Sequence, residues 1–176
     1  MTEITPTVLT TVLPNGITVN FKTATGEDFD WISNEVYPHS EIFPDLYACL
    51  EGGTVQAACE SKNIHAIVAR EAVGTEVLGS LTYRTHKTAA DVTACTVNSV
   101  AVPISAFGQG IGTALINQVL NHARQSIPEG RLNLHVIGRT DHTRGSAKWL
   151  ERLGFVVTGT SLYTGAAMAT QWSRTF

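Results

Sequence analysis

Three glycines at alternating positions, Gly108, Gly110 and Gly112, separate a β-branched stretch from a long amphipathic one. The stretch 92–102 is rich in Val, Thr and Ala and predicts a strand. Over 110–125 the apolar residues return at helical spacing. Glycine lets the backbone turn sharply and approach a ligand, and the first N–H groups of a helix have no internal partner and attract negative charge. This segment therefore predicts an anion site suited to a pyrophosphate.

Two common phosphate-binding patterns do not fit this loop. The dinucleotide fingerprint GxGxxG, begun at Gly108, would need glycine where the chain has Thr113, and no acidic residue follows at the expected distance. The P-loop pattern, GxxxxGK followed by Ser or Thr, is absent. A nucleotide-dependent enzyme with a different glycine-rich loop, which would bind NAD or ATP, stays open as a third hypothesis.

The rest of the chain predicts a strand-rich fold. Strands at 7–13 and 17–23 flank the turn signal Pro14-Asn15-Gly16 and predict a hairpin. A helix begins at the capping sequence Thr25-x-x-Asp28 and ends before Pro38. Antiparallel strands followed by a late β-α-β unit indicate an α+β or mixed α/β architecture. Further strands are expected at 64–70, 77–85, 92–102, 132–137, 155–160 and 167–174, and further helices at 45–50, 54–59 and 143–153.

Length and composition favour one soluble domain over residues 1–176. A chain of 176 residues needs no disulfide or metal to fold. Its three cysteines form no CxxC and its six histidines no HxxxH, so no metal site is expected. No apolar run approaches the roughly 20 residues that cross a bilayer, and the N-terminus lacks a secretory pattern. We expect a cytoplasmic protein with no membrane partner.

Acidic residues concentrate between Lys22 and Lys62. This stretch holds eight of the fifteen acidic residues and no internal Lys or Arg, so nucleic acid is not an expected partner. An acidic segment of this kind is either a solvated helical surface or a surface that attracts a cationic partner. The sequence leaves both alternatives open.

The glycine loop and a later segment together resemble the GNAT acyltransferases. The loop, Val100-x-Val-Pro followed by Gly-Gln-Gly-Ile-Gly-Thr-Ala-Leu115, is similar to the family's pyrophosphate motif, Arg/Gln-x-x-Gly-x-Gly/Ala. The segment from Ser146 to Phe155, which ends in Leu-Gly-Phe, resembles the family's late helix and the start of its next strand. The resemblance, which extends over about 17–173, implies a mixed α/β fold. It implies a mostly antiparallel sheet of six to seven strands flanked by helices, a β-α-β cofactor-binding core, and acetyl-CoA as cofactor.

The resemblance also implies roles for the loop and for the strand before it. Backbone N–H groups over 109–113 would hold the pyrophosphate, and the strand at Val100 would splay from the strand at 132–136 to admit the pantetheine arm. A backbone N–H near Val100 would polarise the thioester carbonyl. Arg139, Arg144 or Lys148 could meet the 3′-phosphate. The implied cofactor-binding residues are Val100, Ala101, Val102, Phe107, Gly108, Gln109, Gly110, Ile111, Gly112, Thr113 and Ser146.

The sequence departs from the family pattern at three places. Phe107 occupies the Arg/Gln position, Leu150 the position of a Tyr that often serves as general acid, and Thr143 the position of a frequent Asn. The pattern around Ser146 instead looks like the branch that acetylates protein N-termini. These departures keep open an alternative hypothesis, a GNAT-fold module that binds acyl-CoA without turnover.

Two residues are candidates for moving the amine and thiol protons. His135 lies in the strand that borders the expected cleft, where a histidine could act as base. Tyr163 follows the last-but-one strand, and its phenol could donate to the leaving sulfur. Both side chains could equally serve packing alone.

The acceptor is expected beside the early helix. In proteins similar to this one, that region forms the wall of the acceptor pocket, here with Trp31, Glu35 and Tyr37 as candidates, while Asn98 could bond a water or the acceptor. The main hypothesis is an acetyl-CoA-dependent N-acetyltransferase in which a neutral amine attacks directly. Its acceptor is a small-molecule or protein amine, cationic in solution, and the chain is a monomer or homodimer.

Overall fold

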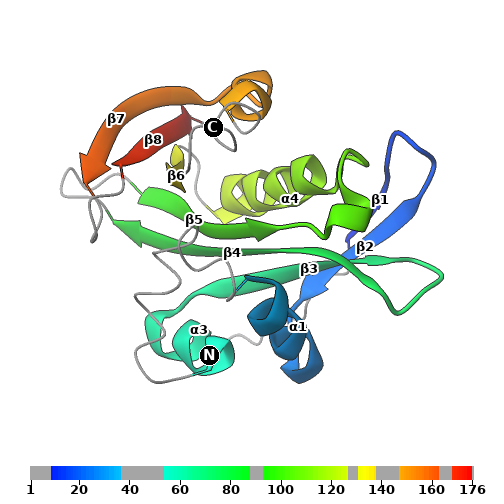
Figure 1. Ribbon diagram of the computed structural model, residues 1–176. Coiled ribbons are helices and arrows are strands. Elements are labelled where there is room, and N and C mark those ends of the chain that lie inside the picture. Colours follow the sequence, from blue (N-terminus) through cyan, green and yellow to red (C-terminus); the bar gives the residue numbers. More distant parts are fainter. Residues whose placement is uncertain are drawn as a thin grey trace.

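The computed structural model describes residues 9–36, 54–87, 93–126, 131–137, 147–162 and 168–175. These residues form one eight-stranded sheet with helices on both faces (Figure 1). The strands are β1 (Leu9–Val12), β2 (Thr18–Thr23), β3 (His65–Glu71), β4 (Val77–Lys87), β5 (Thr93–Ala101), β6 (Arg131–Ile137), β7 (Val156–Leu162) and β8 (Met168–Thr175). The helices are α1 (Gly26–Val36), α3 (Val55–Lys62), the short 3-10 helix η2 (Ile104–Ala106) and α4 (Ile111–Ser126). Residues 147–152 are also helical.

The sheet confirms the mixed α/β prediction. All eight strands predicted from the sequence join it, one more than the six to seven implied by the family resemblance. Strands β1 to β5 pair antiparallel in chain order, and β5, α4 and β6 form the expected β-α-β unit with β5 and β6 parallel. The helix predicted at 45–50 and the start of the late helix, 143–146, lie outside the described residues. That residues 1–176 make a single domain stays a prediction.

Local sequence signals explain several element boundaries. The β1–β2 turn closes with Gly16 N–H bonded to the Leu13 carbonyl at 2.9 Å, and Gly16 has a φ of 84° that suits glycine. Thr25 precedes α1, and both its N–H and its hydroxyl donate to the Asp28 carboxylate, so the predicted capping pair is confirmed. Thr54 caps α3 by accepting the Ala57 N–H at 3.1 Å.

The late helix ends in a Schellman motif. Gly154, with φ 80°, donates its N–H to the Glu151 carbonyl, and Phe155 donates to the Leu150 carbonyl. Leu150 and Phe155 are both buried in the main core, which is the hydrophobic contact that accompanies this motif. The predicted helix end at Gly154 is therefore confirmed.

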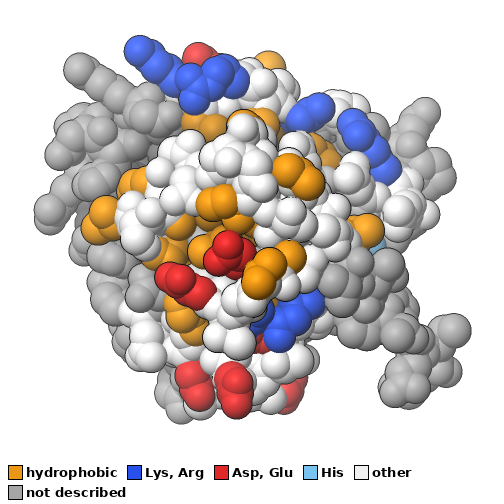
Figure 2. All heavy atoms as spheres, turned by 90° about the vertical axis from the view of Figure 1, so that its right-hand side faces the viewer, with side chains coloured by type: hydrophobic (Ala, Val, Ile, Leu, Met, Phe, Trp, Pro, Cys, Tyr) orange, Lys and Arg blue, Asp and Glu red, His pale blue; other side chains and the backbone are white. Residues whose placement is uncertain are grey.

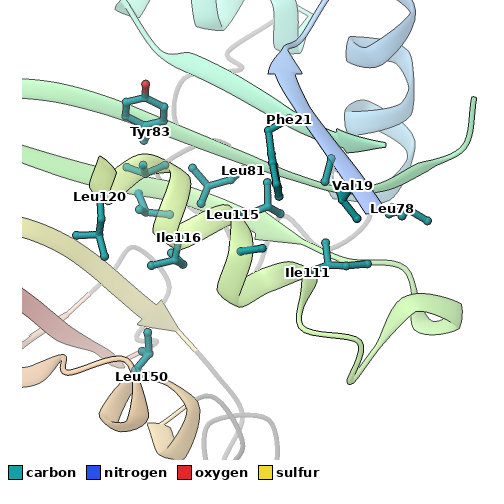
Figure 3. Close-up of a cluster of buried hydrophobic side chains, with 14 of the residues drawn as sticks. Val19, Phe21, Leu78, Leu81, Tyr83, Ile111, Leu115, Ile116, Leu120 and Leu150 are labelled. Carbon is teal, nitrogen blue, oxygen red and sulfur yellow. The ribbon is translucent and has the colours of Figure 1, made fainter. Parts of the chain in front are cut away.

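The main core lies between α4 and one face of the sheet (Figure 3). Fully buried Ile111, Leu115 and Ile116 of α4 face Leu81 and other apolar side chains of the strands, and Leu150 reaches the same cluster from the late helix. Burial of such side chains contributes roughly 1.5–3 kcal/mol each. This packing fixes the start of α4 against the sheet.

A second, smaller cluster lies under α1 and α3. Its buried members include Ile32 of α1, Val55 of α3 and Val68 of β3. Beside it the Asp28 carboxylate, with no exposed surface, is ion-paired with Lys22 and Arg70. These contacts fasten α1 to β2 and β3.

Candidate active site

The predicted glycine loop forms a tight turn at the start of α4. Gly108 and Gly110 have φ values of 76° and 89°, a conformation that side chains with a Cβ rarely adopt. Helix α4 begins at Ile111, so the N–H groups at 111–113 lie in its first turn, where a helix offers no carbonyl partner. Within the described residues, no protein acceptor bonds the backbone N–H of Gln109, Gly110 or the residues of this turn. The loop has the geometry of an anion site.

Phe107 differs from its neighbours in this loop. Its backbone N–H donates to the Ile104 carbonyl within η2, and its ring is 64% exposed. The peptide N–H of Phe107 is therefore already used, and its ring is the part that could contact a cofactor.

Two distant segments brace the glycine loop, and sequence reasoning missed both. The β1–β2 turn lies beside it: a Cβ on Gly110 would lie 3.4 Å from Pro14 Cδ, and Asn15 Nδ2 donates to Gln109 Oε1 at 3.5 Å. From the late helix, Trp149 Nε1 donates to Thr113 Oγ1 at 2.9 Å, and its indole ring lies over Gly112. Nothing local in the sequence signals these contacts, because they join residues far apart in the chain.

Strands β5 and β6 part next to this loop. They pair in parallel from Ala94↔Arg131 to Val97↔Leu134, where the pairing stops. Strand β5 continues to Ala101 along β4, and β6 continues to Ile137 along β8. The β6-facing edge of 98–101 thus has no described strand partner, so it offers backbone groups to an extended ligand. This is the splaying that the family resemblance implies for the pantetheine arm.

Two predicted residues lie at the vertex where the strands part. Asn98 and His135 are the first positions beyond the last β5–β6 pair. Asn98 is also a β-bulge, since Thr82 pairs with Ser99 while Tyr83 pairs with Val97. The Asn98 side chain is only 6% exposed, and neither of its amide atoms has a hydrogen-bond partner among the described residues.

The other predicted residues are placed in part. Val100, Ala101 and Val102 are half-buried on the strand end before the loop. Trp31 of α1 and Ala101 of β5 both pack against the second cluster. Glu35 lies in α1 and His135 in β6, but their side chains are not among those described. Tyr37, Ser146 and Tyr163 lie outside the described residues, as do Arg139 and Arg144.

A second group of titratable side chains lies on the α4 face, under β3 and β4. Tyr83 hydrogen-bonds through its hydroxyl to His122 Nδ1, and the His65 ring stacks on the Tyr83 ring. Burial lowers the pKa of His65, with a further contribution from nearby His122. Burial raises the pKa of the Cys95 thiol to about 12, so this thiol is protonated at neutral pH.

The end of the molecule with the β1–β2 turn and the start of α4 faces the viewer in Figure 2. Hydrophobic side chains gather in its centre, most basic side chains lie above them, and acidic side chains lie among them and below, with a further basic group below the centre. Lys148 of the late helix is exposed and is the one candidate for the 3′-phosphate among the described residues. No helix within the described residues is long and apolar enough to span a membrane.

Comparison with models of known protein families matches residues 62–157 to an acetyltransferase (GNAT) domain. The match spans more than half of the chain, from the end of α3 into β7, and includes the glycine loop and the vertex. The chain belongs to the GNAT acetyltransferase family. Membership confirms the family resemblance, and the roles of the glycine-loop residues toward acetyl-CoA stay predictions.

Solved structures agree with this assignment at the level of the fold. A GNAT-family acetyltransferase from Desulfovibrio desulfuricans is 18% identical, with a TM-score of 0.66 over 89% of this chain and 98% of that one. Arabidopsis thaliana NAA60 in complex with a bisubstrate analogue is 17% identical, with a TM-score of 0.67 over 90% and 99%. The yncA acetyltransferase of Salmonella typhimurium, solved with acetyl-CoA, is 17% identical, with a TM-score of 0.64 over 89% and 92%. No curated protein matches the sequence.

The family confirms an acyltransferase and acetyl-CoA as its cofactor. The residues present fit that cofactor. The helix N-terminus offers unpartnered N–H groups to a diphosphate, and the free edge of β5 suits the amide-containing pantetheine arm.

Proposed function

We propose that this protein is an N-acetyltransferase that moves the acetyl group of acetyl-CoA to an amine. The observation that carries the proposal is the junction of the free β5 edge with the α4 start behind Gly108 and Gly110. A ligand with its diphosphate on the α4 N–H groups and its arm along the free edge of β5 would bring its thioester beside Val100, close to the vertex. The acetyl group would then lie where the two strands part.

The proposed reaction is direct attack. The neutral amine nitrogen bonds to the thioester carbonyl carbon, the carbon–sulfur bond breaks, and the proton lost by the amine ends on the sulfur of coenzyme A. A backbone N–H near Val100 would stabilise the oxygen that becomes negative during attack. His135, whose backbone lies at the vertex, is the proposed base, and Tyr163 is the proposed acid.

The acceptor is proposed to be a small-molecule or protein amine that is cationic in solution. Exposed acidic residues on α1, Glu27 and Asp30 among them, support attraction of a cation on that side of the sheet. Structural neighbours include NAA60 with a bisubstrate analogue, Arabidopsis Naa50 with a CoA–peptide analogue and the NatC complex with a Gag peptide. These relatives favour a peptide N-terminus. A cytoplasmic location and a monomer or homodimer stay predictions from the sequence.

The test is a charge placed on the first turn of α4. Gly112 has an ordinary helical backbone, and a Cβ there would meet Trp149 at 3.5 Å, an ordinary contact. We expect Gly112→Glu to weaken acetyl-CoA binding at least ~100-fold by calorimetric titration, because a carboxylate about 4 Å from a phosphate costs about 4 kcal/mol near a protein surface. Gly112→Gln has the same size without the charge, and Gly112→Ala tests the added Cβ alone.

In this test, Gly112→Ala should bind like the wild type, and Gly112→Gln should retain much more affinity than Gly112→Glu. Equal affinity for Gly112→Glu and Gly112→Gln would place the diphosphate elsewhere. A folded wild type that binds NAD or ATP and not acetyl-CoA would refute the proposal.

A binding module without turnover is the second candidate. Leu150, at the position where the family often has a Tyr acid, has no exposed surface and is part of the main core. This position therefore supplies no proton donor. The two functions differ in one measurement: release of free thiol from acetyl-CoA upon addition of a panel of amines supports the enzyme, while tight binding with no thiol release supports the module.

A further inference from the structure

Three observations coincide at Asn98. The residue is a β-bulge in β5, it is the first β5 position after β6 pairing ends, and its side chain is 6% exposed with both amide atoms unpartnered. Two buried hydroxyls beside it do have partners, since those of Thr82 and Ser99 hydrogen-bond to each other at 2.7 Å. Asn98 is thus a buried donor and a buried acceptor for which the described part of the chain supplies no partner.

A buried amide without hydrogen-bond partners destabilises the folded state. Buried polar groups are nearly always hydrogen-bonded, and an amide left without partners loses its bonds to water. A bound water or a substrate group has to complete the bonding of Asn98. Because the amide presents both an acceptor, Oδ1, and donors on Nδ2, it suits a ligand that carries an N–H beside an oxygen.

The described strand neighbours of Asn98 carry no charge. Val97 and Ser99 flank it along β5, and Thr82 and Tyr83 are the opposite pair on β4. None of these four residues is a carboxylate, and an ammonium ion buried without a counter-charge is strongly disfavoured. These neighbours therefore favour the neutral form of an amine at this position, which is also its nucleophilic form.

We propose that the Asn98 carboxamide receives the attacking amine at the vertex, with Oδ1 accepting an amine N–H and Nδ2 donating to an oxygen of the bound substrates. This inference rests on the proposed acetyl transfer and adds to it the residue that orients the acceptor. Asn98 gains and loses no proton: the amine nitrogen bonds to the acetyl carbon, the carbon–sulfur bond breaks, and the amine proton ends on the thiolate.

Selection of a neutral amine also limits the acceptor class. A peptide α-amine has a pKa near 7.7–8.0 and a lysine ε-amine near 10.4, so at pH 7.5 the neutral fraction is larger by roughly 100-fold or more for the α-amine. We expect Asn98 to serve an α-amine or another amine of similar basicity.

The experiment compares two substitutions that each remove a buried unpartnered amide. Asn98→Leu removes it at the vertex, and Gln118→Met removes it in α4, where Gln118 Oε1 is also buried without a partner. We expect both variants to melt at or above the wild-type temperature, by up to about 2–4 °C, because an unsatisfied group is replaced by an apolar one. Asn98→Leu should lose at least ~100-fold in kcat/KM for the amine, with an unchanged Kd for acetyl-CoA, while Gln118→Met should keep wild-type turnover.

The outcomes separate this inference from the proposed function. If the wild type transfers acetyl groups and Asn98→Leu, folded and binding acetyl-CoA, does so equally well, Asn98 does not orient the acceptor. If Asn98→Leu is inactive only because it melts far below the wild type, Asn98→Ala decides: it removes both amide groups without adding an apolar side chain of the same size, and wild-type activity of this folded variant would overturn the inference. A wild type without transfer to any amine would refute the proposed function itself.

A pair of peptides tests the acceptor class. One has a free α-amine and an acetylated lysine, and the other a blocked N-terminus and a free lysine, in the same sequence. We expect at least ~100-fold higher kcat/KM for the free α-amine at pH 7.5, a gap that narrows as pH rises. A preference for the lysine peptide at pH 7.5 would contradict neutral-amine selection at Asn98.

Discussion

The two faces of the sheet are built from different chemistry. On the α4 face, Leu81, Val97 and Leu115 belong to a continuous apolar core. On the α1 face, alternate residues of the same strands bury hydroxyls: Ser80 and Thr82 of β4 and Ser99 of β5 have at most 2% exposed surface. Successive side chains of one strand thus point to opposite faces: those on the α4 face pack in the apolar core, and those on the α1 face are polar.

The difference indicates where the chemistry takes place. An apolar face can be made stable by packing alone, but buried hydroxyls and amides need partners. The Thr82 and Ser99 hydroxyls hydrogen-bond to each other, while the Ser80 hydroxyl and the Asn98 amide have no partner within the residues that the structure describes. The α4 face therefore holds the cofactor loop in position, and the polar residues of β4 and β5 form the side that the acceptor is proposed to meet.

The largest expected effect is a cavity on the α4 face. Leu115 is fully buried between α4 and the sheet, so Leu115→Ala should lower the free energy of unfolding by about 2–5 kcal/mol. Urea denaturation monitored by circular dichroism measures this loss. Ile104→Ala, at a side chain that is 85% exposed, is the control and should change stability by less than about 0.5 kcal/mol. An equal loss of unfolding free energy in the two variants would show that Leu115 contributes no more to stability than an exposed side chain.

A smaller loss of stability is expected when the buried carboxylate on the α1 face, that of Asp28, is replaced. Burial acts to raise the pKa of Asp28, but hydrogen bonds from the Thr25 backbone, Arg70, the Thr25 hydroxyl and Lys22 outweigh it, so the pKa is held below its ordinary value of 3.8. We expect Asp28→Asn to cost about 1–3 kcal/mol at pH 7, less than a fully buried pair, because Lys22 and Arg70 reach solvent.

The pH dependence of this group has a definite sign. A carboxylate with a lowered pKa in the folded state stabilises the protein above the unfolded pKa near 3.8, and this stabilisation is lost as pH falls through the folded pKa. Melting temperatures of wild type and Asp28→Asn should therefore differ at pH 7 and converge below about pH 3.8. A gap that stays constant down to pH 3 would show that the ion pairs do not supply the difference.

The smallest expected effect concerns the brace on the glycine loop. Trp149→Phe keeps an aromatic ring but removes the 2.9 Å bond from Nε1 to Thr113, together with the outer indole atoms that lie over Gly112. Since a neutral hydrogen bond contributes about 0.5–1.5 kcal/mol, acetyl-CoA should bind about three- to tenfold more weakly. Thr113→Val removes the other partner of this hydrogen bond. The double variant should therefore lose less affinity for acetyl-CoA than the sum of the losses in the two single variants. Fully additive losses would mean that the bond does not position the loop.

Local signals made much of the fold predictable. The capping residues Thr25 and Thr54, the glycine at 154 and the helical spacing of α4 each act within a few residues, and the structure bears them out. The glycine loop was predictable for the same reason, since the glycines that allow its turn directly precede the residues that begin α4. Side chains at the vertex were harder: Asn98 was a candidate for the acceptor, but no sequence pattern showed that its amide would be buried without a partner.

The order of strands and helices, the glycine-rich turn at the start of α4 and the family could all be predicted from the sequence. These depend on residue types at short spacing, where backbone preference and periodicity decide. Three features could not be predicted in this way: β5 parts from β6 after Val97, Asn15 reaches a loop 94 residues away, and Trp149 lies over Gly112. Such features arise from register and packing between distant segments. Each of these contacts stabilises the protein only after folding has brought its two partners together.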